Sequence, residues 1–206
     1  LNNTRASMPK DLYGSQLAIG YSAVKREGVR EKVNFFNANG ITPAAGFSST
    51  VLDLGKFASW QFRLRDSSLV EILKPSTLKN MQRVHYTDPD WSTTWGLGFS
   101  VYKGSDGNTW VGHGGSCPGY RSTLQLNLKT KRAFSAMINA SGTNPGKYTD
   151  GINTIMNKMG VKKSDVNKEA SAKLNDYVGY FDSSPWWGES YIGSYNGKLV
   201  RLSLPS

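Results

Sequence analysis

Cysteine and histidine are both scarce in this chain of 206 residues, which contains one cysteine, Cys117, and two histidines, His85 and His113. A single cysteine excludes an internal disulfide framework and any metal site built from several thiolates. The two histidines are far apart in sequence, and neither has a carboxylate at the spacing that zinc ligands usually show. We therefore expect no bound metal and no other cofactor.

Long apolar runs are missing as well. No stretch approaches the roughly 18 consecutive apolar residues that a membrane-spanning helix needs, and no signal peptide opens the chain. The opening residues, LNNTRASMPKDLYG, have neither an initiator methionine nor a targeting pattern. We expect that the chain begins inside a longer protein and that it contains no membrane span.

Acidic residues are outnumbered, because 25 Lys and Arg against 15 Asp and Glu give a formal net charge of +10. An excess of this size is one mark of nucleic-acid binding. The sequence nevertheless has no run of like charge, no basic helix face and no recognised nucleic-acid motif. We therefore read most of these charges as solvated and expect no nucleic-acid partner.

What the sequence does contain is a clear change of hydrophobic period. Residues 50–64 predict a helix, because Thr50 and Asp53 form a capping-box pattern and apolar residues recur at helical spacing. The face expected to be buried consists of Val51, Leu54, Phe57, Ala58 and Leu64. A shorter helix is expected from Pro75 to about His85.

After this second helix the apolar residues alternate. A period of two over residues 95–103, 108–115, 120–128 and 133–140 predicts neighbouring antiparallel strands. Residues 146–160 then read as an amphipathic helix, ending at Gly160, whose inward side chains are Ile152, Ile155, Met156 and Met159. Together these elements predict an α+β fold in which an antiparallel sheet is flanked by helices.

The composition changes near Val161, where the chain becomes polar. Residues 161–174 are expected to form a linker between a first domain, residues 1–160, and a second one. Residues 175–206 contain short strand patterns and the hairpin signal Asn196-Gly197. We interpret this last part as the beginning of a small all-β domain.

The segment VGHGGSCPGYRST, residues 111–123, carries the clearest functional signal. With the segments PAAGFSSTVLDLGKF and WGLGFSV before it, it resembles the serine β-lactamase and penicillin-binding-protein superfamily. The nearest resemblance is to its class C-like branch, which includes esterases and D-aminopeptidases. His113-Gly114-Gly115 is similar to the third motif of the family, Lys-Thr-Gly or His-x-Gly. The resemblance covers residues 1–160 and implies a β-lactamase/transpeptidase-like fold, while the tail is similar to the lipocalin-like domain that often follows.

This resemblance implies roles for five residues. The backbone N–H of Ser116 would be one donor of an oxyanion hole, and His113 would line the pocket and donate a hydrogen bond or a positive charge. Gly114 and Gly115 would let a substrate lie against the strand. Arg121, on the following strand, is a candidate for binding a substrate carboxylate. The ordinary alternatives, a strand histidine beside a glycine turn and a solvated arginine, stay open.

The same family requires a nucleophilic serine in a Ser-x-x-Lys pattern and a Tyr-x-Asn loop. No Tyr-x-Asn occurs in this sequence. Ser7–Lys10 and Ser76–Lys79 fit the first pattern, but one lies in an apolar-poor loop and the other follows the helix at 50–64, which the family nucleophile precedes. We therefore expect both motifs on an upstream segment of the same protein, with this chain as the C-terminal portion.

One alternative nucleophile lies within the motif. Cys117 follows His113 by four residues, so a Cys–His pair is conceivable, although this spacing on a strand does not ensure contact. The other interpretation of Cys117 is a small buried filler.

The sequence thus predicts the C-terminal part of a serine hydrolase that acts through an acyl-enzyme on an amide, ester or β-lactam. The chain alone is expected to be inactive. The alternative is a non-catalytic binding module of the same fold that recognises peptidoglycan-like or D-amino-acid peptides. The resemblance favours a periplasmic or secreted location.

Overall fold

The computed structural model describes residues 1–159, 174–182, 190–195 and 198–203. The chain divides into two compact units, Leu1–Ile155 and Met156–Ser206, which are described separately below. The boundary between the units falls inside a helix. The linker expected at residues 161–174 lies, apart from Leu174, outside the described residues, as does Gly160.

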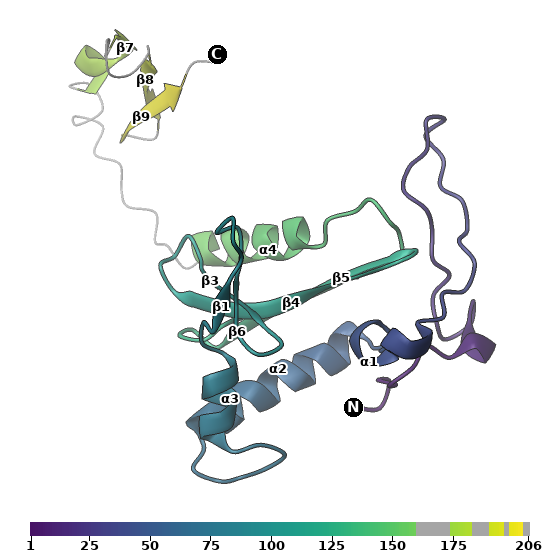
Figure 1. Ribbon diagram of the computed structural model, residues 1–206. Helices are drawn as coiled ribbons and strands as arrows, with labels where there is room; N and C mark the ends of the chain where they lie inside the picture. Colours follow the sequence, from purple (N-terminus) through teal and green to yellow (C-terminus); the bar gives the residue numbers. More distant parts are fainter. Residues whose placement is uncertain (160–173, 183–189, 196–197, 204–206) are drawn as a thin grey trace. The chain divides into compact units, whose positions relative to one another are not determined.

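An antiparallel sheet forms the centre of the first unit (Figure 1). Its strands follow one another in chain order: β1 (Tyr86–Thr87), β2 (Thr94–Trp95), β3 (Ser100–Lys103), β4 (Thr109–Cys117), β5 (Tyr120–Asn127) and β6 (Arg132–Ile138). The expected strands are confirmed, except that the first one is split. A tight turn separates β2 from β3, because Gly98 has a φ of +77° and Gly96 N donates to Phe99 O at 2.7 Å.

Helices lie on both faces of this sheet (Figure 1). The helix α2 (Val51–Asp66) covers one face together with α3 (Pro75–Met81), and α4 (Gly146–Met159) lies on the other. Shorter helical segments are η1 (Lys10–Leu12), η2 (Asn39–Ile41) and α1 (Thr42–Ala45). The predicted α+β architecture, an antiparallel sheet flanked by helices, is confirmed.

The main core lies between α2, α3 and the sheet. Its buried side chains are Ala58, Leu64, Leu78, Phe99, Val101, Val111 and Leu126. Burial of each such leucine contributes about 1.5–3 kcal/mol. Val101, Val111 and Leu126 lie opposite one another across β3, β4 and β5, as a one-faced core requires. Phe99 precedes β3 and lies two positions before Val101.

The start of α2 follows the capping pattern only in part. Thr50 Oγ1 accepts a hydrogen bond from Asp53 N at 3.3 Å, as expected for an N-cap. The carboxylate of Asp53 is buried and instead accepts hydrogen bonds from Asn3 N and the Thr4 hydroxyl, at 2.7 and 3.0 Å. It therefore ties the first residues of the chain to the helix.

Three expectations about the helices are wrong. In α4, the apolar residues Ile152, Ile155, Met156 and Met159 are exposed, and the buried residue is Thr149, whose hydroxyl donates to Gln125 Oε1 at 3.1 Å. Val51 of α2 is 45% exposed. The helix α3 ends at Met81 rather than His85, because the chain turns into β1 and His85 N donates to Trp95 O.

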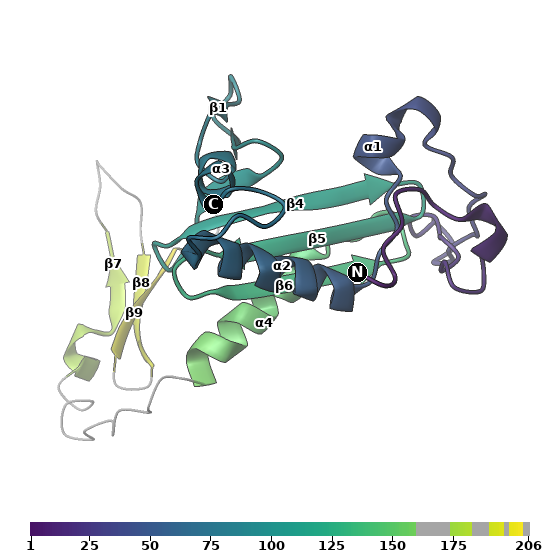
Figure 2. The same ribbon diagram turned by 90° about the horizontal axis from the view of Figure 1, so that it is seen from below.

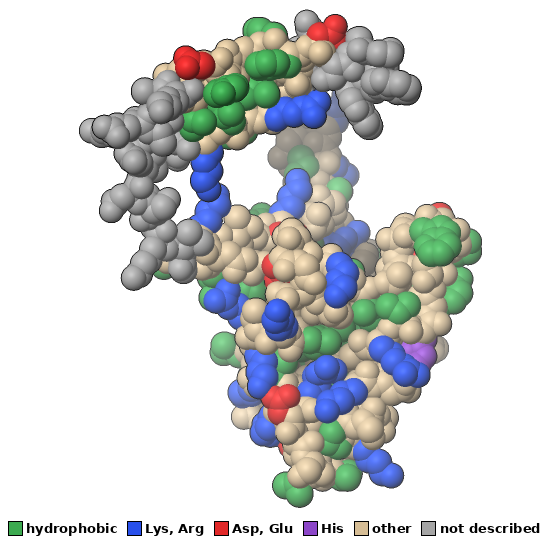
Figure 3. All heavy atoms as spheres, turned by 90° about the vertical axis from the view of Figure 1, so that its left-hand side faces the viewer, with side chains coloured by type: hydrophobic (Ala, Val, Ile, Leu, Met, Phe, Trp, Pro, Cys, Tyr) green, Lys and Arg blue, Asp and Glu red, His purple; other side chains and the backbone are tan. Residues whose placement is uncertain are grey.

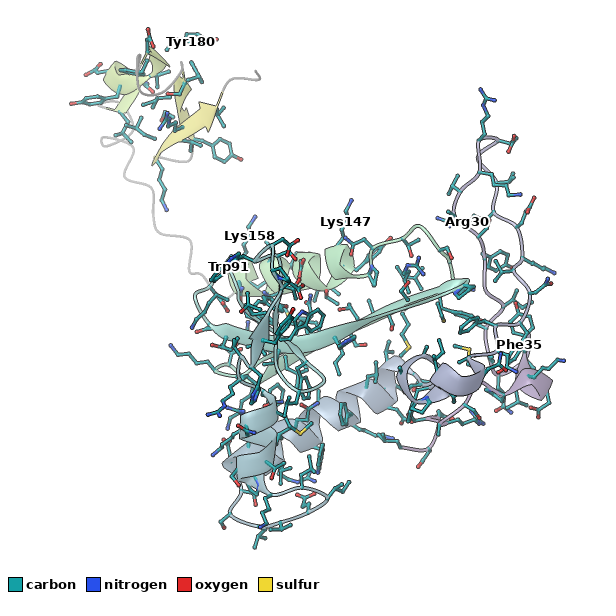
Figure 4. The ribbon with its side chains drawn as sticks, in the orientation of Figure 1. Arg30, Phe35, Trp91, Lys147, Lys158 and Tyr180 are labelled. Carbon is teal, nitrogen blue, oxygen red and sulfur yellow. The ribbon has the colours of Figure 1, made fainter. Side chains whose placement is uncertain are left out.

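The N-terminal arm, residues 1–41, packs against the end of the sheet where β4 meets β5 (Figures 1 and 2). Tyr21 extends the hydrogen bonding beyond β6, since its N–H donates to Asn139 O at 3.0 Å. Arg30 Nη1 donates to Ser141 O at 2.8 Å, and the ring of Phe35 lies edge-on to Tyr13. Figure 4 labels Arg30 and Phe35 on this arm.

The second unit contains a small antiparallel sheet in the order β7 (Gly179–Phe181), β8 (Ser190–Tyr195) and β9 (Lys198–Ser203), preceded by η3 (Asn175–Tyr177). Tyr180 and Tyr191 pair across it with ring centroids 5.0 Å apart. A small C-terminal β unit is thus confirmed, while its lipocalin-like character stays a prediction. The hairpin turn Asn196-Gly197 lies outside the described residues.

Candidate active site

The second half of β4 has a strand neighbour on one side only. The strand β5 pairs with β4 from Trp110 to Cys117, whereas the pairing with β3 ends where Ser100 meets Gly112. Among the described residues no strand continues beside residues 113–117 on the β3 side (Figure 2). The motif found in the sequence therefore lies on an open strand edge, and residues 113–116 are exposed.

The register shows which main-chain groups point to that open edge. In an antiparallel sheet the N–H and C=O of one residue point to the same neighbour, and successive residues alternate. Gly104 N donates to Asn108 O, so the even-numbered residues of β4 face β3. Leu128 N donates to Thr109 O, so the odd-numbered ones face β5. The N–H groups of Gly114 and Ser116 therefore point outward from the sheet, where no strand binds them.

His113 lies at the start of this open edge. Its Nδ1 is 2.6 Å from the carbonyl oxygen of Gly114, and its ring centroid is 5.9 Å from that of Trp95. Because a carbonyl oxygen only accepts hydrogen bonds, Nδ1 carries a proton in this contact, and Nε2 is left for another partner. The indole N–H of Trp95 donates to Asp88 Oδ1 at 3.0 Å, which fixes the indole beside the imidazole.

Trp95 is a site residue that the sequence alone did not indicate. Its only signal is its place in WGLGFSV, the segment that carries part of the family resemblance. The contact with His113 depends on the turn between β2 and β3, which brings Trp95 opposite Ser100. That turn could not be placed from the alternating pattern.

The glycines of β4 meet different surroundings. A Cβ added at Gly112 would overlap the carbonyl oxygen of Leu124, so this position needs glycine for packing. A Cβ at Gly114 would have Ser122 O at 3.7 Å as its nearest neighbour, which is an ordinary contact. A Cβ at Gly115 would meet the Ser122 hydroxyl, which can rotate away. Gly114 and Gly115 thus leave the exposed part of β4 without side chains at two positions, and packing does not require glycine at either position.

Arg121 is not brought together with the His113 side chain. It pairs with Ser116 in the register, so its side chain leaves the sheet on the face opposite to that of His113. Its Nη1 donates to the carbonyl oxygens of Cys117 and Tyr120, at 3.1 and 2.8 Å. In this arrangement Arg121 binds the turn between β4 and β5.

Cys117 and His113 do share a face, but they are four strand residues apart, which is about 13 Å along β4. Burial raises the pKa of the Cys117 thiol, and the positive charge of Arg121 offsets this only in part. A Cys–His nucleophile pair is therefore absent from this arrangement. Ser7 and Ser76, the two serines of the Ser-x-x-Lys patterns, are both exposed.

Among the described residues, no three His, Cys, Asp or Glu side chains lie close enough together to hold a metal ion. Nor does any helix of the described part combine the length and the apolar character that crossing a bilayer requires.

The beta-lactamase family model matches residues 3–154 of this chain, which include α2 and the whole of β4 and β5. The chain belongs to the beta-lactamase family. The resemblance that the sequence suggested is confirmed at this level. A comparison with curated proteins gives no match.

Solved structures of this family share the fold. The octameric penicillin-binding protein homologue from Pyrococcus abyssi has a TM-score of 0.64 at 22% identity, over 95% of this chain and 43% of that one. The class C beta lactamase from Rhodobacter sphaeroides has a TM-score of 0.54 at 13% identity, over 77% and 50%. The D-amino acid amidase from Ochrobactrum anthropi has a TM-score of 0.53 at 22% identity, over 76% and 49%.

At these identities the likeness concerns the fold. This chain spans half or less of the length of each of these three solved structures. That the chain is the C-terminal portion of a longer enzyme stays a prediction.

Proposed function

We propose that this chain supplies the substrate-binding strand and one donor of the oxyanion hole to a serine hydrolase of the beta-lactamase family. The observation that carries the proposal is the open edge of β4, on which the Ser116 N–H has no strand partner. An acyl-transfer enzyme needs preorganised N–H donors where negative charge develops on the attacked carbonyl oxygen. A main-chain N–H held by an eight-residue pairing with β5 meets that need without a cost of reorganisation.

The neighbouring residues fit the same role. Gly114 and Gly115 leave the strand bare, so that an acyl group can approach the main chain as closely as an added strand does. His113 donates from Nδ1 to Gly114 O, which leaves Nε2 to hydrogen-bond a substrate or a catalytic hydroxyl from another segment. Arg121, through its bonds to the turn carbonyls, stabilises the end of β4 and would meet a substrate carboxylate only after breaking them.

The nucleophile and its lysine are proposed to lie on an upstream segment. Both Ser-x-x-Lys patterns of this chain have exposed serines, and no Tyr-x-Asn occurs. A nucleophilic serine needs an adjacent base within hydrogen-bond reach in a water-poor site. The chain alone would then be inactive, and the intact protein would form an acyl-enzyme with an amide, ester or β-lactam. The amidase and the β-lactamase among the similar structures support the amide and the β-lactam as substrate classes.

The experiment compares the 206-residue chain with the same chain joined to its upstream segment. Both are incubated with a fluorescent penicillin and with a fluorophosphonate, and the modified residue is located by mass spectrometry. We expect an adduct on a serine outside residues 1–206 and none on the chain alone. Turnover of a chromogenic ester by the chain alone would contradict the proposal.

The second function, a non-catalytic module that binds peptidoglycan-like or D-amino-acid peptides, is favoured by the same open edge, because an extended peptide can pair with it. The labelling distinguishes the two. A protein with its upstream segment that binds such a peptide saturably, but is modified by neither probe, is the binding module.

A further inference from the structure

A second candidate binding region lies away from the open edge of β4. An open surface cavity of about 790 Å³ is lined by the C-terminal end of α2, by α3 and the residues that follow it, by the hairpin between β3 and β4, and by the turn after β5. None of residues 113–117 lines it. Its lining contains five cationic side chains and, among the residues that the structure describes, no carboxylate: Arg65, Lys79, Arg83, Lys103 and Lys129.

These charges come from separate elements and converge on one space. Figure 3 shows the face that carries β1, β3 and α3 in Figure 1, where Lys and Arg side chains gather with few carboxylates between them. The ion pairs formed among the described residues engage Lys25, Lys56, Arg63 and Lys131, and none of the five cavity cations. The carboxylate of Asp66 forms an ion pair with Lys131 and also interacts electrostatically with Arg65 and Lys79. It offsets part of the positive charge, and the cavity lining still carries an excess of cations.

Arg65 is held in the cavity wall by a buried chain of amides. Its Nη1 donates to Gln82 Oε1 at 2.7 Å, and Gln82 Nε2 donates to Gln61 Oε1 at 2.6 Å. Gln82 and Gln61 are 3% and 0% exposed. Burial lowers the pKa of Arg65, and the nearby Asp66 raises it in part. A half-buried guanidinium with a fixed orientation and further N–H groups is a preorganised hydrogen-bond donor for an anion.

We propose that this cavity binds a small ligand that carries more than one phosphoryl group. Guanidinium groups bind phosphate oxygens through two parallel N–H bonds, and lysines add point charges at the rim. The volume exceeds what one phosphate fills, and the cations come from α2, from α3 and the segment after it, from β3 and from the turn after β5. A ligand with several anionic centres contacts more of them than a single ion does. This site is independent of the acyl-transfer function proposed for β4.

The test measures the binding of inorganic tripolyphosphate to the protein by isothermal titration calorimetry at low salt. The variant Lys79→Gln/Arg83→Gln/Lys103→Gln removes three exposed cavity cations and leaves Arg65 and its buried amides in place. The control Lys10→Gln/Lys32→Gln/Lys147→Gln lowers the net charge by the same amount at exposed positions outside the cavity. Circular dichroism and thermal unfolding establish that both variants are folded.

We expect saturable binding of tripolyphosphate that weakens at least roughly tenfold in the cavity variant and less than about twofold in the control, since charge-assisted contacts are lost only in the first. Equal affinities in the two variants, or no saturable binding by the unaltered protein, would overturn the proposal. Citrate, a tricarboxylate, provides the second arm. If citrate binds as tightly as tripolyphosphate, the assignment to phosphoryl groups is wrong.

Discussion

Three of four consecutive residues of β4, from Gly112 to Gly115, are glycines, and their surroundings differ. Gly112 is buried in the sheet, where the carbonyl oxygen of Leu124 leaves no space for a Cβ. Gly114 and Gly115 are exposed, and only a rotatable hydroxyl or an ordinary contact lies beside them. Packing explains the first glycine. The approach of a ligand to the strand, as proposed above, would account for the other two.

This difference predicts that two matched substitutions affect stability differently. Gly112→Ala should lower the free energy of unfolding by about 1–3 kcal/mol, because the added methyl group forces the two strands apart. Gly114→Ala should leave stability unchanged and slow acylation of the protein that includes its upstream segment. Urea unfolding of both variants, followed by circular dichroism, measures the first effect. Equal destabilisation by the two substitutions would show that both glycines serve packing.

We expect the carboxyl group of Asp106, in the hairpin between β3 and β4, to make the stability of the fold depend on pH. Partial burial raises the pKa of its carboxyl, but hydrogen bonds from Asn108, Trp110 and Asn127 lower it by more, so the net pKa is below the usual value. A carboxylate with a lowered folded-state pKa stabilises the fold above its unfolded pKa of about 3.9, and this contribution is lost as the pH falls through the folded value.

The measurement compares thermal unfolding of the unaltered chain and Asp106→Asn between about pH 7 and pH 2.5. The other carboxylates titrate equally in both proteins, so the difference between the two curves reports Asp106. We expect the unaltered chain to be more stable at neutral pH, with a difference that shrinks below about pH 4. A difference that stays constant across this range would contradict the assigned role.

Among the elements, α2 and α4 show what hydrophobic periodicity can predict. The start of α2 could be read from the sequence because Thr50 stands at the N-cap position, although the Asp53 carboxylate binds Asn3 and Thr4 instead of completing a capping box. The period of α4 also predicted a helix correctly. Periodicity tells which side chains share a face, but not what covers that face, and in α4 the apolar face of Ile152 and Ile155 is exposed.

The same exposed apolar face of α4 leads us to expect that copies of this chain associate with one another. Ile152 and Ile155 are 50% and 59% exposed, and β6, the last strand of its sheet, has β5 as its one strand neighbour among the described residues. Exposed apolar helix faces and open strand edges both bind other chains. We therefore expect the 206-residue chain to self-associate as its concentration rises, unless a complementary segment is supplied.

Analytical ultracentrifugation over a hundredfold range of concentration tests this expectation. Ile155→Lys should weaken the association, whereas Thr154→Lys, which adds the same charge at the neighbouring exposed position, should weaken it less. A compact monomer at every concentration would contradict the prediction.

At the scale of the whole molecule, the sequence predicted the fold class, the order of the main strands and the family, because these depend on local patterns and on the His113-Gly114-Gly115 motif. It could not predict which way the Ser116 N–H points, since that depends on the register and on where β3 ends. For the same reason it could not place Arg121 on the opposite face from His113. Pairing across strands is a property of the fold, not of any one segment.

The central claim, that the Ser116 N–H on the open edge of β4 stabilises an oxyanion, is tested most directly by the acylation rates of Ser116→Pro and Ser116→Ala. Proline removes the N–H, and because that group faces away from β5, no hydrogen bond of the sheet is lost. Alanine keeps the N–H. In the protein with its upstream segment, acylation by a chromogenic ester should fall about 10²–10³-fold for Ser116→Pro and change little for Ser116→Ala. Equal rates for two folded variants would contradict the account.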